Sequence, residues 1–386
     1  MVSGTVPEHE RVMKALNFEE PDRVPRFDLF WPEFTDVWRR GKGLAPDADP
    51  TDYYGVDMVV VAADETAWPT RAEVLSGDTD ELMSRLSGGF GRSSQTSGGL
   101  VRTGWGAVHR LVEGTFFYEE IEPGLSERTD PDKLEFDDPL LDSRYAAAGA
   151  EAEQYKGRCA VFAKTGGPYL RAATVRGIEN FLVDIAEDPE WVMAFVERMT
   201  DHMIQVGVEQ IRRFGLESTG IGIYDDVATN HGLIMGLSRY EKLFYPSLRK
   251  MVAAYKKAGA AKVFTHCDGY DEPAFDLWVD AGIDATHPLE SRTGMDPVKI
   301  REKYDGKLAV IGGLDNCDIL PRGDRDEIKR HVLHVLEAGW GGGLVLAPHS
   351  IGTDISVDTY EYLMELCQQY GNYPLENPTA RNPMED

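Results

Sequence analysis

The stretch Lys262-Val-Phe-Thr-His-Cys-Asp-Gly269 is a short apolar run that ends in an imidazole and a carboxylate. Apolar runs without strict alternation are typical of parallel strands that are covered on both faces. In an extended segment residues i and i+2 point to the same side, so His266 and Asp268 should reach one point while Cys267 points away. The stretch therefore predicts a buried strand that delivers two polar side chains to its carboxyl end.

Seven further runs of this kind occur along the chain, with helical patterns between them, which predicts βα units and a parallel sheet. Eight units predict an α/β fold of the (β/α)8 TIM-barrel type, and we expect residues 1–386 to form that single domain. Residues 87–129, rich in Gly, Ser and Thr, predict an inserted extended segment between strands 2 and 3, either near the barrel mouth or as a surface excursion. The predicted strands are residues 24–30, 57–63, 159–165, 220–225, 262–266, 284–289, 308–312 and 343–347.

The composition of the chain limits its partners and its compartment. A net charge of −26 over 386 residues disfavours nucleic acid and anionic membrane surfaces. No run of about 18 apolar residues is present, and the start of the chain lacks the apolar segment of a secretory signal. The 4 cysteines are widely spaced and form no CxxC pair, which favours a reducing compartment. We therefore expect a cytoplasmic protein that acts on a small molecule.

Ionisable side chains follow nearly every predicted strand. In a barrel, the carboxyl ends of the strands converge on the face that holds the active site. Apolar strands that repeatedly deliver acids and imidazoles to one rim are costly to explain by packing alone. A single acid at such a position can instead cap the next helix, and for Asp225, Asp226 and Asp315 that alternative stays open. The residues at the strand ends are Asp28, Asp64, Lys164, Asp225, Asp226, His266, Asp268, Glu290, Asp315 and His349.

Three of these residues form a candidate metal site. His349 follows the last predicted strand, which lies near the first strand when a barrel closes. Together with His266 and Asp268 it supplies two imidazoles and one carboxylate, a set that suits Zn²⁺ or another divalent ion. The alternative is a hydrogen-bonded Asp–His cluster without metal, with a catalytic or a structural role.

Several motifs together resemble the uroporphyrinogen decarboxylase superfamily, and the resemblance covers almost the whole chain. It implies a (β/α)8 barrel independently of the strand count. The motifs are Arg11-Val-Met-Lys-Ala-Leu16, Glu20-Pro-Asp-Arg-Val-Pro25, Tyr224-Asp-Asp-Val227, Thr265-His-Cys-Asp-Gly269, Gly312-Gly-Leu-Asp315, Gly342-Gly-Leu-Val-Leu-Ala-Pro-His-Ser350 and Tyr370-Gly-Asn-Tyr-Pro374.

Two branches of this superfamily imply different activities. True decarboxylases carry an arginine-rich segment after the first strand that clamps the carboxylates of the tetrapyrrole, whereas residues 26–34 hold a single arginine, Arg26. The other branch contains methyltransferases that exchange methyl groups with a corrinoid carrier and hold zinc with a His-x-Cys pair and a later Cys. The matching positions are His266, Asp268 and His349, so oxygen and nitrogen replace the two sulfur ligands.

The leading hypothesis is therefore a corrinoid-linked methyltransferase that takes a methyl group from a small O- or N-methylated substrate, or delivers one. His266, Asp268 and His349 would be catalytic and metal-binding. The corrinoid would ride on a separate carrier protein, because no Asp-x-His-x-x-Gly cobalamin segment occurs. The alternatives are a metal-free lyase that decarboxylates a small acid or a tetrapyrrole, and a non-catalytic binding barrel. The sequence indicates no oligomeric state. The expected substrate-binding residues are Asp225, Asp226, Glu290 and Asp315.

Overall fold

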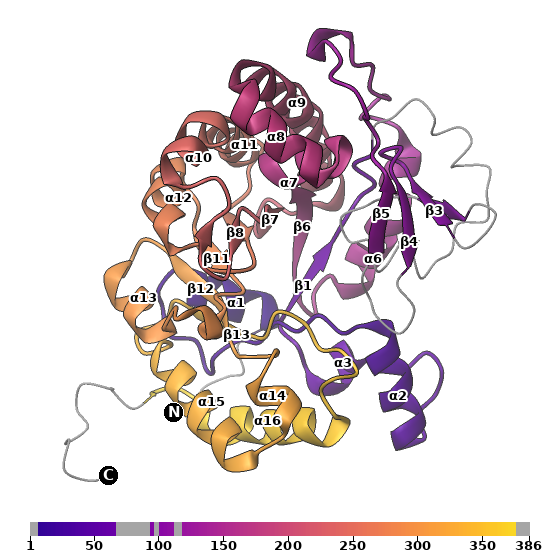
Figure 1. Cartoon of the computed structure of the whole chain (residues 1–386). Helices are drawn as coiled ribbons and strands as arrows, with labels where there is room; N and C mark the ends of the chain where they lie inside the picture. The colour runs from indigo at the N-terminus through magenta and orange to yellow at the C-terminus, as the bar shows by residue number, and fades with distance from the viewer. Residues whose placement is uncertain (1–6, 67–92, 96–99, 112–117, 376–386) are drawn as a thin grey trace.

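The computed structural model describes residues 7–66, 93–95, 100–111 and 118–375. Its centre is a curled, parallel seven-stranded sheet in the order β1-β6-β7-β10-β11-β12-β13 (Figure 1). Each of these strands lies within two residues of a predicted one at both ends. Their bounds are β1 Met58–Val61, β6 Ala160–Gly166, β7 Gly220–Tyr224, β10 Lys262–His266, β11 Ala285–His287, β12 Ala309–Gly313 and β13 Leu344–Ala347.

The first predicted strand, residues 24–30, is wrong as a regular strand. Isolated parallel bridges nevertheless join this segment to both edges of the sheet, because Arg26 pairs with Leu346 of β13 and Phe27 pairs with Met58 of β1. Pro25 has no N–H to donate, and the N–H of Arg26 donates to the Asp57 carboxylate, so neither N–H takes part in a strand ladder. The segment thus occupies the place between β13 and β1 where an eighth strand would complete the curl.

Alternate residues of the strands enter two separate cores. One set forms a core inside the curl of the sheet, here called the lumen core, and the other packs against the surrounding helices. Helix α1 (Glu8–Leu16) adds Val12, Ala15 and Leu16 to the lumen core. Burial on both sides explains why the strands are apolar at nearly every position. The strand residues of the lumen core are Met58, Ala160, Phe162, Tyr224, Phe264, Ala285, Ala309, Ile311, Val345 and Ala347, joined by Phe27.

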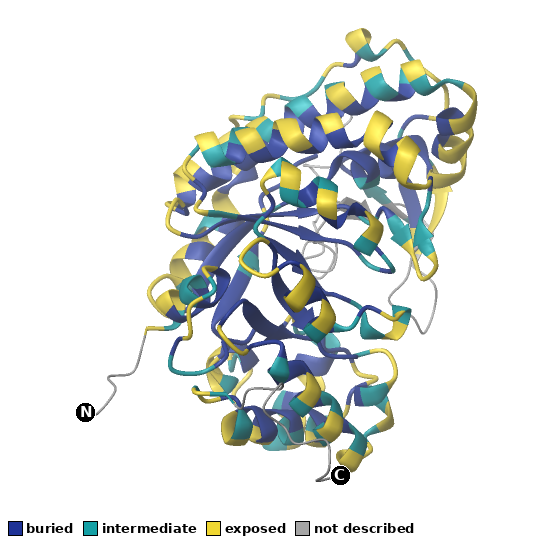
Figure 2. Cartoon of the chain, turned by 90° about the vertical axis from the view of Figure 1, so that its left-hand side faces the viewer, coloured by how far each residue is buried: buried dark blue, intermediate teal, exposed yellow. Residues whose placement is uncertain are grey.

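Amphipathic helices cover the outside of the sheet with their apolar faces inward (Figure 2). The longest is α9 (Pro189–Phe214), which begins where the Asp188 carboxylate accepts a hydrogen bond from the Trp191 N–H at 3.1 Å. Among the described residues, no helix is long and apolar enough to cross a bilayer. The other helices are α2 Pro32–Lys42, α3 Pro50–Tyr54, α6 Ala146–Tyr155, α7 Pro168–Arg176, α8 Ile178–Glu187, α10 Leu237–Leu243, α11 Tyr245–Lys257, α12 Phe275–Ala281, α13 Pro297–Lys303, α14 Ile319–Arg322, α15 Arg325–Glu337 and α16 Val357–Tyr370.

An antiparallel sheet lies between β1 and β6 in the chain, in the region of the predicted extended insertion. Its strands pair in the order β2-β3-β4-β5. Residues 87–92, 96–99 and 112–117 of the predicted insertion lie outside the described residues. The place of residues 87–129 near the barrel mouth, and their status as an insertion in a single domain, stay predictions. The bounds are β2 Ser93–Gln95, β3 Leu100–Thr103, β4 Val108–Leu111 and β5 Tyr118–Glu122, and a two-stranded pair, β8 Ala228–Thr229 and β9 Gly232–Leu233, follows β7.

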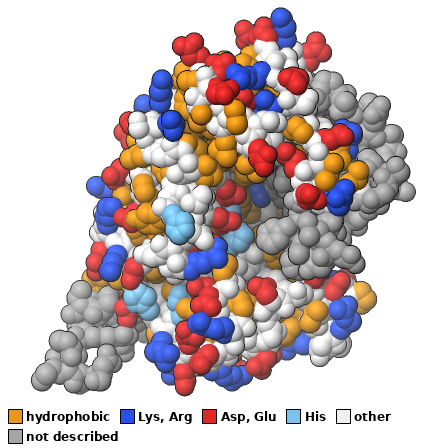
Figure 3. Space-filling view, in the orientation of Figure 1, with side chains coloured by type: hydrophobic (Ala, Val, Ile, Leu, Met, Phe, Trp, Pro, Cys, Tyr) orange, Lys and Arg blue, Asp and Glu red, His pale blue; other side chains and the backbone are white. Residues whose placement is uncertain are grey.

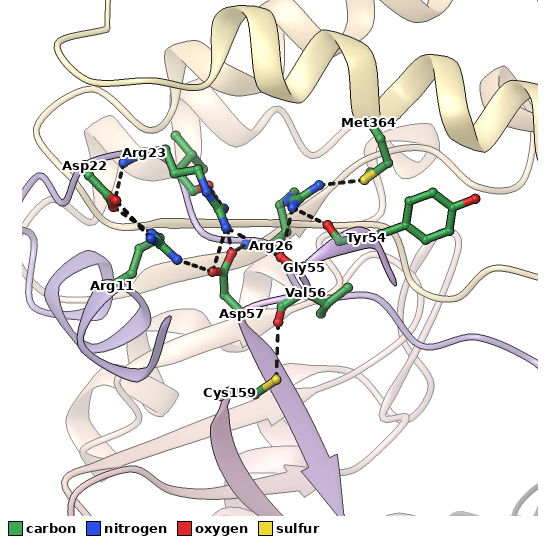
Figure 4. Close-up of polar contacts among 11 residues, drawn as sticks. Arg11, Asp22, Arg23, Arg26, Tyr54, Gly55, Val56, Asp57, Cys159 and Met364 are labelled. Atoms are coloured by element: carbon green, nitrogen blue, oxygen red, sulfur yellow. Dashed lines mark hydrogen bonds and ion pairs between the residues drawn. The ribbon is translucent and has the colours of Figure 1, made fainter. Parts of the chain in front are cut away.

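A buried charge cluster surrounds Asp57, directly before β1 at the amino end of the sheet. Its carboxylate accepts hydrogen bonds from Arg11 Nη1 at 2.5 Å, Arg23 Nη1 at 2.7 Å and the backbone N of Arg26 at 2.8 Å (Figure 4). Arg11 also pairs with Asp22 at 2.6 Å. A fully buried carboxylate is tolerated only when partners compensate its charge, so this cluster ties α1 and the segment before the sheet to β1.

The Arg26 side chain has its own partners at the same end of the sheet. Its guanidinium donates to the carbonyl oxygens of Tyr54 at 2.6 Å and Gly55 at 2.9 Å, and contacts Met364 Sδ at 2.7 Å (Figure 4). The single arginine of residues 26–34 therefore holds backbone at the amino end, away from the carboxyl ends of the strands.

Candidate functional site

A layer of polar side chains continues the lumen core toward the carboxyl ends of the strands. Four of its members lie two residues after a lumen-core residue of the same strand, so they point to the same side. His266 follows Phe264 in this way, and His287 follows Ala285. The layer consists of Lys164, Tyr224, His266, His287 and His349, where Tyr224 itself belongs to the lumen core.

Two members of this layer, His266 and His349, lie close to Asp268, the third predicted metal ligand. The Asp268 Oδ1 atom lies 3.7 Å from His266 Nε2 and 3.7 Å from His349 Nε2. All three ligand atoms lie within 4.8 Å of one another. His266 is buried, whereas Asp268 and His349 keep some exposure, so the group is reachable from outside.

The geometry of this group fits a divalent ion. Zinc ligands at about 2.1 Å in tetrahedral arrangement are about 3.4 Å apart, so small movements would bring the three atoms into range. Asp268 Oδ1 is buried and has no hydrogen-bond partner among the described residues. A carboxylate oxygen left in this state is costly unless a positive group faces it. The two nitrogen donors and one oxygen donor therefore form a fitting but incomplete ligand set, which leaves room for a further ligand.

His287 is a member of the site that the sequence prediction missed. Its Nδ1 lies 2.6 Å from His266 Nδ1, and both rings are buried. Its Nε2 has no hydrogen-bond partner in the part of the chain that the structure describes. The spacing from Ala285 to His287 repeats the spacing from Phe264 to His266, and this signal in the sequence would have found it.

Burial sets the charge state of the two imidazoles. It lowers the pKa of His266 well below its usual range, and the nearby His287 and His349 lower it further. Burial likewise lowers the pKa of His287, with His349 adding to the effect. Both rings are consequently neutral near pH 7, which is the state that a metal ligand requires.

Asp226 supports the group from the end of β7. Its Oδ1 accepts a hydrogen bond from the Asp268 backbone N–H at 3.2 Å and lies 3.9 Å from His266 Nε2. Burial and the Asp268 charge raise the pKa of Asp226 to about 6. The structure therefore brings Asp226 to the metal-ligand group, in a position that orients Asp268.

A small, open pocket lies beside the group and shares His349 with it. Glu290, Asp315 and Cys317 also line this pocket. The Glu290 carboxylate accepts a hydrogen bond from the Gly269 N–H at 3.1 Å and pairs with Arg292 at 3.3 Å. Figure 3 shows acidic and histidine side chains around a hollow in this face of the molecule.

Two of the acids predicted to bind substrate, Asp225 and Asp315, accept hydrogen bonds from backbone N–H groups. Asp225 is buried, and its carboxylate accepts hydrogen bonds from the N–H groups of Tyr169 at 3.3 Å and Leu170 at 2.6 Å in the first turn of α7. Asp315 Oδ1 accepts from the N–H groups of Cys317 at 2.9 Å and Asp318 at 2.8 Å. This is the helix-cap and turn role that was the alternative for both residues. A substrate contact of either acid stays a prediction.

The predicted orientation of Cys267 is confirmed, because its side chain packs in the core between strands and helices. The four cysteines of the chain are free.

Comparisons with known proteins place this site in a family. The family model described as Uroporphyrinogen decarboxylase (URO-D) matches residues 118–370. The chain belongs to this family. The match spans β6 to β13 and includes His266, Asp268 and His349, so the whole ligand group lies in the region that matches URO-D proteins.

A solved structure has the same architecture. A methyltransferase from Methanosarcina mazei is similar over 94% of this chain and 99% of its own, with a TM-score of 0.64 and 16% sequence identity. At this identity the similarity establishes the shared fold. A comparison with curated proteins gives no match.

Proposed function

We propose that this URO-D family member is a methyltransferase of the corrinoid-linked type. It would transfer a methyl group between a small O- or N-methylated molecule and a corrinoid on a separate carrier protein. The observation that carries the proposal is the convergence of His266, Asp268 and His349 within 4.8 Å at the carboxyl ends of the strands. The similar structure from Methanosarcina mazei is that of a methyltransferase, which supports the same class.

In the demethylating direction, one bond to the methyl carbon breaks and one forms. The bond from the methyl carbon to oxygen or nitrogen breaks, and its electron pair stays on that heteroatom, which gains a proton. The methyl carbon forms a new bond with the two electrons of reduced cobalt in the carrier. A divalent ion held by the three ligands would act as a Lewis acid on the heteroatom of the substrate.

The residues of the chain supply the support for such an ion. The proposal requires His266 Nδ1 to donate to His287 Nδ1, because the lone pair of His266 Nε2 is then free on the side of Asp268 and His349. Second-sphere partners of this kind fix the tautomer and the ring orientation of a ligand. Asp226 holds the backbone of Asp268, and Glu290 lines the small pocket beside His349.

The lyase alternative has weaker support. A decarboxylase of the tetrapyrrole needs a clamp for several carboxylates at the mouth of the barrel. Arg26, the one arginine of the matching segment, donates to Tyr54 and Gly55 carbonyls at the amino end instead. The arginine clamp of that activity is thus missing from residues 26–34.

Metal analysis and a methyl-transfer assay test the proposal together. Purified protein should hold about one equivalent of Zn²⁺, Co²⁺ or Mn²⁺ after reconstitution. With free cob(I)alamin in place of the carrier and a panel of O- and N-methylated compounds, the absorbance of cob(I)alamin should give way to that of methylcobalamin, and a chelator should stop this change. Metal well below one equivalent after reconstitution, or carbon dioxide release from small acids instead, would overturn the proposal in favour of the lyase.

A further inference from the structure

Lys164 is a cation at the candidate site whose charge has no close counter-ion among the described residues. It lies at the carboxyl end of β6, two residues after Phe162 of the lumen core, so its side chain extends along the same face of the sheet. Its Nζ lies 4.0 Å from the ring centre of Tyr224. Within the described ranges of the chain, this ammonium makes no ion pair and no hydrogen bond. No acceptor among the described residues therefore engages its three N–H groups, which stay open to water or to a ligand.

The nearby carboxylates serve other groups. Glu65 is ion-paired with Arg171 and accepts hydrogen bonds from Thr165 Oγ1 at 3.0 Å and the Gly166 N–H at 2.8 Å. Asp226 holds the Asp268 backbone. Burial, and then the charge of Arg171, lower the pKa of Lys164 to about 8 despite these acids. The environment thus leaves the ammonium form of Lys164 under-compensated.

Tyr224 links Lys164 to the metal-ligand group. The rings of Tyr224 and His266 stack with centres 4.3 Å apart. The Lys164 ammonium contacts the same Tyr224 ring, 4.0 Å from its centre. The ammonium therefore lies no more than about 8 Å from the His266 ring centre, the limit set by the two contacts that meet at Tyr224.

We propose that Lys164 is the binding point for an anionic group of the substrate, and that the substrate is a small methylated molecule carrying a carboxylate. The anion would accept hydrogen bonds from the Lys164 ammonium while the methylated heteroatom faces His266, Asp268 and His349. This inference rests on the proposed function, because that function supplies the second end of the substrate.

Two observations support a carboxylate over a neutral group. A carboxylate supplies both the negative charge and the acceptors that Lys164 lacks within the described part of the chain, and charge-assisted hydrogen bonds are about twice as strong as neutral ones. Because the ammonium lies no more than about 8 Å from the His266 ring centre, the anion and the methylated atom of the substrate should be separated by only a short chain or one ring. The chain as a whole carries a net charge of −26, which does not favour anionic ligands. The position of Lys164 beside Tyr224 nevertheless provides a local positive charge at the candidate site.

The experiment compares acids with their neutral amides by calorimetry. The probes are methoxyacetate and 3-methoxybenzoate, each paired with methoxyacetamide or 3-methoxybenzamide. Wild-type protein should bind at least one of the acids about ten- to a hundredfold more tightly than its amide, the range expected for a charge-assisted hydrogen bond. Lys164→Met removes the charge at similar length and should abolish the preference, whereas Lys164→Arg should retain part of it.

Titrations in the presence of a chelator separate this inference from the proposed function. If the acid preference persists without metal and Lys164→Met removes it, the inference stands even when no metal site forms. Equal affinity of acid and amide for wild-type protein, or an unchanged preference in a folded Lys164→Met variant, would overturn it. If Lys164→Met does not fold, the wild-type comparison and Lys164→Arg still decide. Lys164→Met should leave the metal content unchanged, since Lys164 is not a ligand.

Discussion

The Nδ1 atoms of His266 and His287 lie 2.6 Å apart, so one buried imidazole must donate its proton to the other. If His266 donates, its Nε2 is free to bind a metal ion beside Asp268 and His349. If His287 donates, a neutral His266 carries its proton on Nε2 and cannot act as a ligand. The metal-binding hypothesis therefore requires the first arrangement, with His287 as acceptor.

This relationship predicts the effect of changes at His287. His287→Ala should weaken Zn²⁺ or Co²⁺ affinity about ten- to a hundredfold, the range for loss of a second-sphere partner, while one equivalent still binds at saturation. His287→Gln places an amide oxygen as acceptor and should recover part of the affinity. Competition with a chromophoric chelator measures both. An unchanged affinity in a folded His287→Ala protein would contradict the tautomer argument.

The three ligands themselves should be individually essential. Single changes of His266, Asp268 or His349 to Ala should abolish stoichiometric metal, because two remaining donors compete poorly with water. Elemental analysis after gel filtration measures this. The matched control is His334→Ala, an exposed histidine paired with Asp296, which should keep its metal. The acid/base cluster without metal predicts instead that no variant or chelator changes metal content, and that only the rate falls.

The same site should lose metal in acid. Ligand imidazoles must be neutral, so metal affinity falls as pH falls. Burial lowers the pKa of His266 well below its usual range, so this ligand should stay neutral, and metal should be retained, to a pH below the value near 6.5 at which free histidine protonates. Dialysis against buffers from about pH 4 to pH 8, followed by elemental analysis, checks this, and retention that is constant across the series would count against histidine ligands.

The double change Asp268→Cys, His349→Cys should convert the site toward sulfur ligands. Thiolates are softer donors than carboxylate and imidazole and favour zinc over harder ions. Zn²⁺ should therefore bind more tightly than to wild-type protein, and the Co²⁺-substituted variant should show thiolate-to-cobalt charge-transfer absorption. Absence of that absorption at one equivalent of Co²⁺ would show that the two positions do not share a metal ion.

Asp225 should make stability depend on pH. Burial raises the pKa of this carboxyl to about 7, although its bonds to the Leu170 and Tyr169 N–H groups oppose the shift. Between about pH 4 and pH 7, the folded protein therefore keeps a proton on Asp225 that the unfolded chain has lost. The free energy of unfolding that this proton contributes is fully present below about pH 4 and is lost as the pH rises to about 7. In the wild-type protein this titration should lower the free energy of unfolding by about 1.4 kcal/mol per pH unit between about pH 4 and pH 7, and Asp225→Asn should remove this dependence. Urea unfolding of the wild-type protein and the variant at pH 4.5 and pH 7.5 measures this dependence. The same change in unfolding free energy between the two pH values in both proteins would contradict the prediction.

The charge cluster at the other end of the sheet should affect stability alone. Asp57→Asn leaves the guanidinium groups of Arg11 and Arg23 without their shared carboxylate and should cost about 3–5 kcal/mol of unfolding free energy. Where the variant folds, its metal stoichiometry should equal that of wild-type protein. Loss of metal from a folded Asp57→Asn protein would show that the two ends of the sheet are coupled.

Much of the fold could be predicted from local pattern, because seven buried parallel strands leave apolar runs that can be counted along the chain. The failure at residues 24–30 has a local cause only in part, since Pro25 lacks an N–H, while the Arg26 N–H is engaged by the distant Asp57 carboxylate. Asp225 shows the limit of local pattern. Its place after β7 fits a site residue and a helix cap equally well, and only the position of α7 distinguishes the two.

The sequence by itself determined which side chains could share a face, because alternation along a strand depends only on chain geometry. His266 and Asp268 were paired on that basis, and the expected closure of a barrel added His349 to the pair. Only the tertiary structure decided which faces meet. The contacts of His287 with His266, and of Lys164 with Tyr224, join different strands, and their distances depend on strand register and on the curl of the sheet. Those quantities arise from packing of the whole chain, so no local pattern contains them.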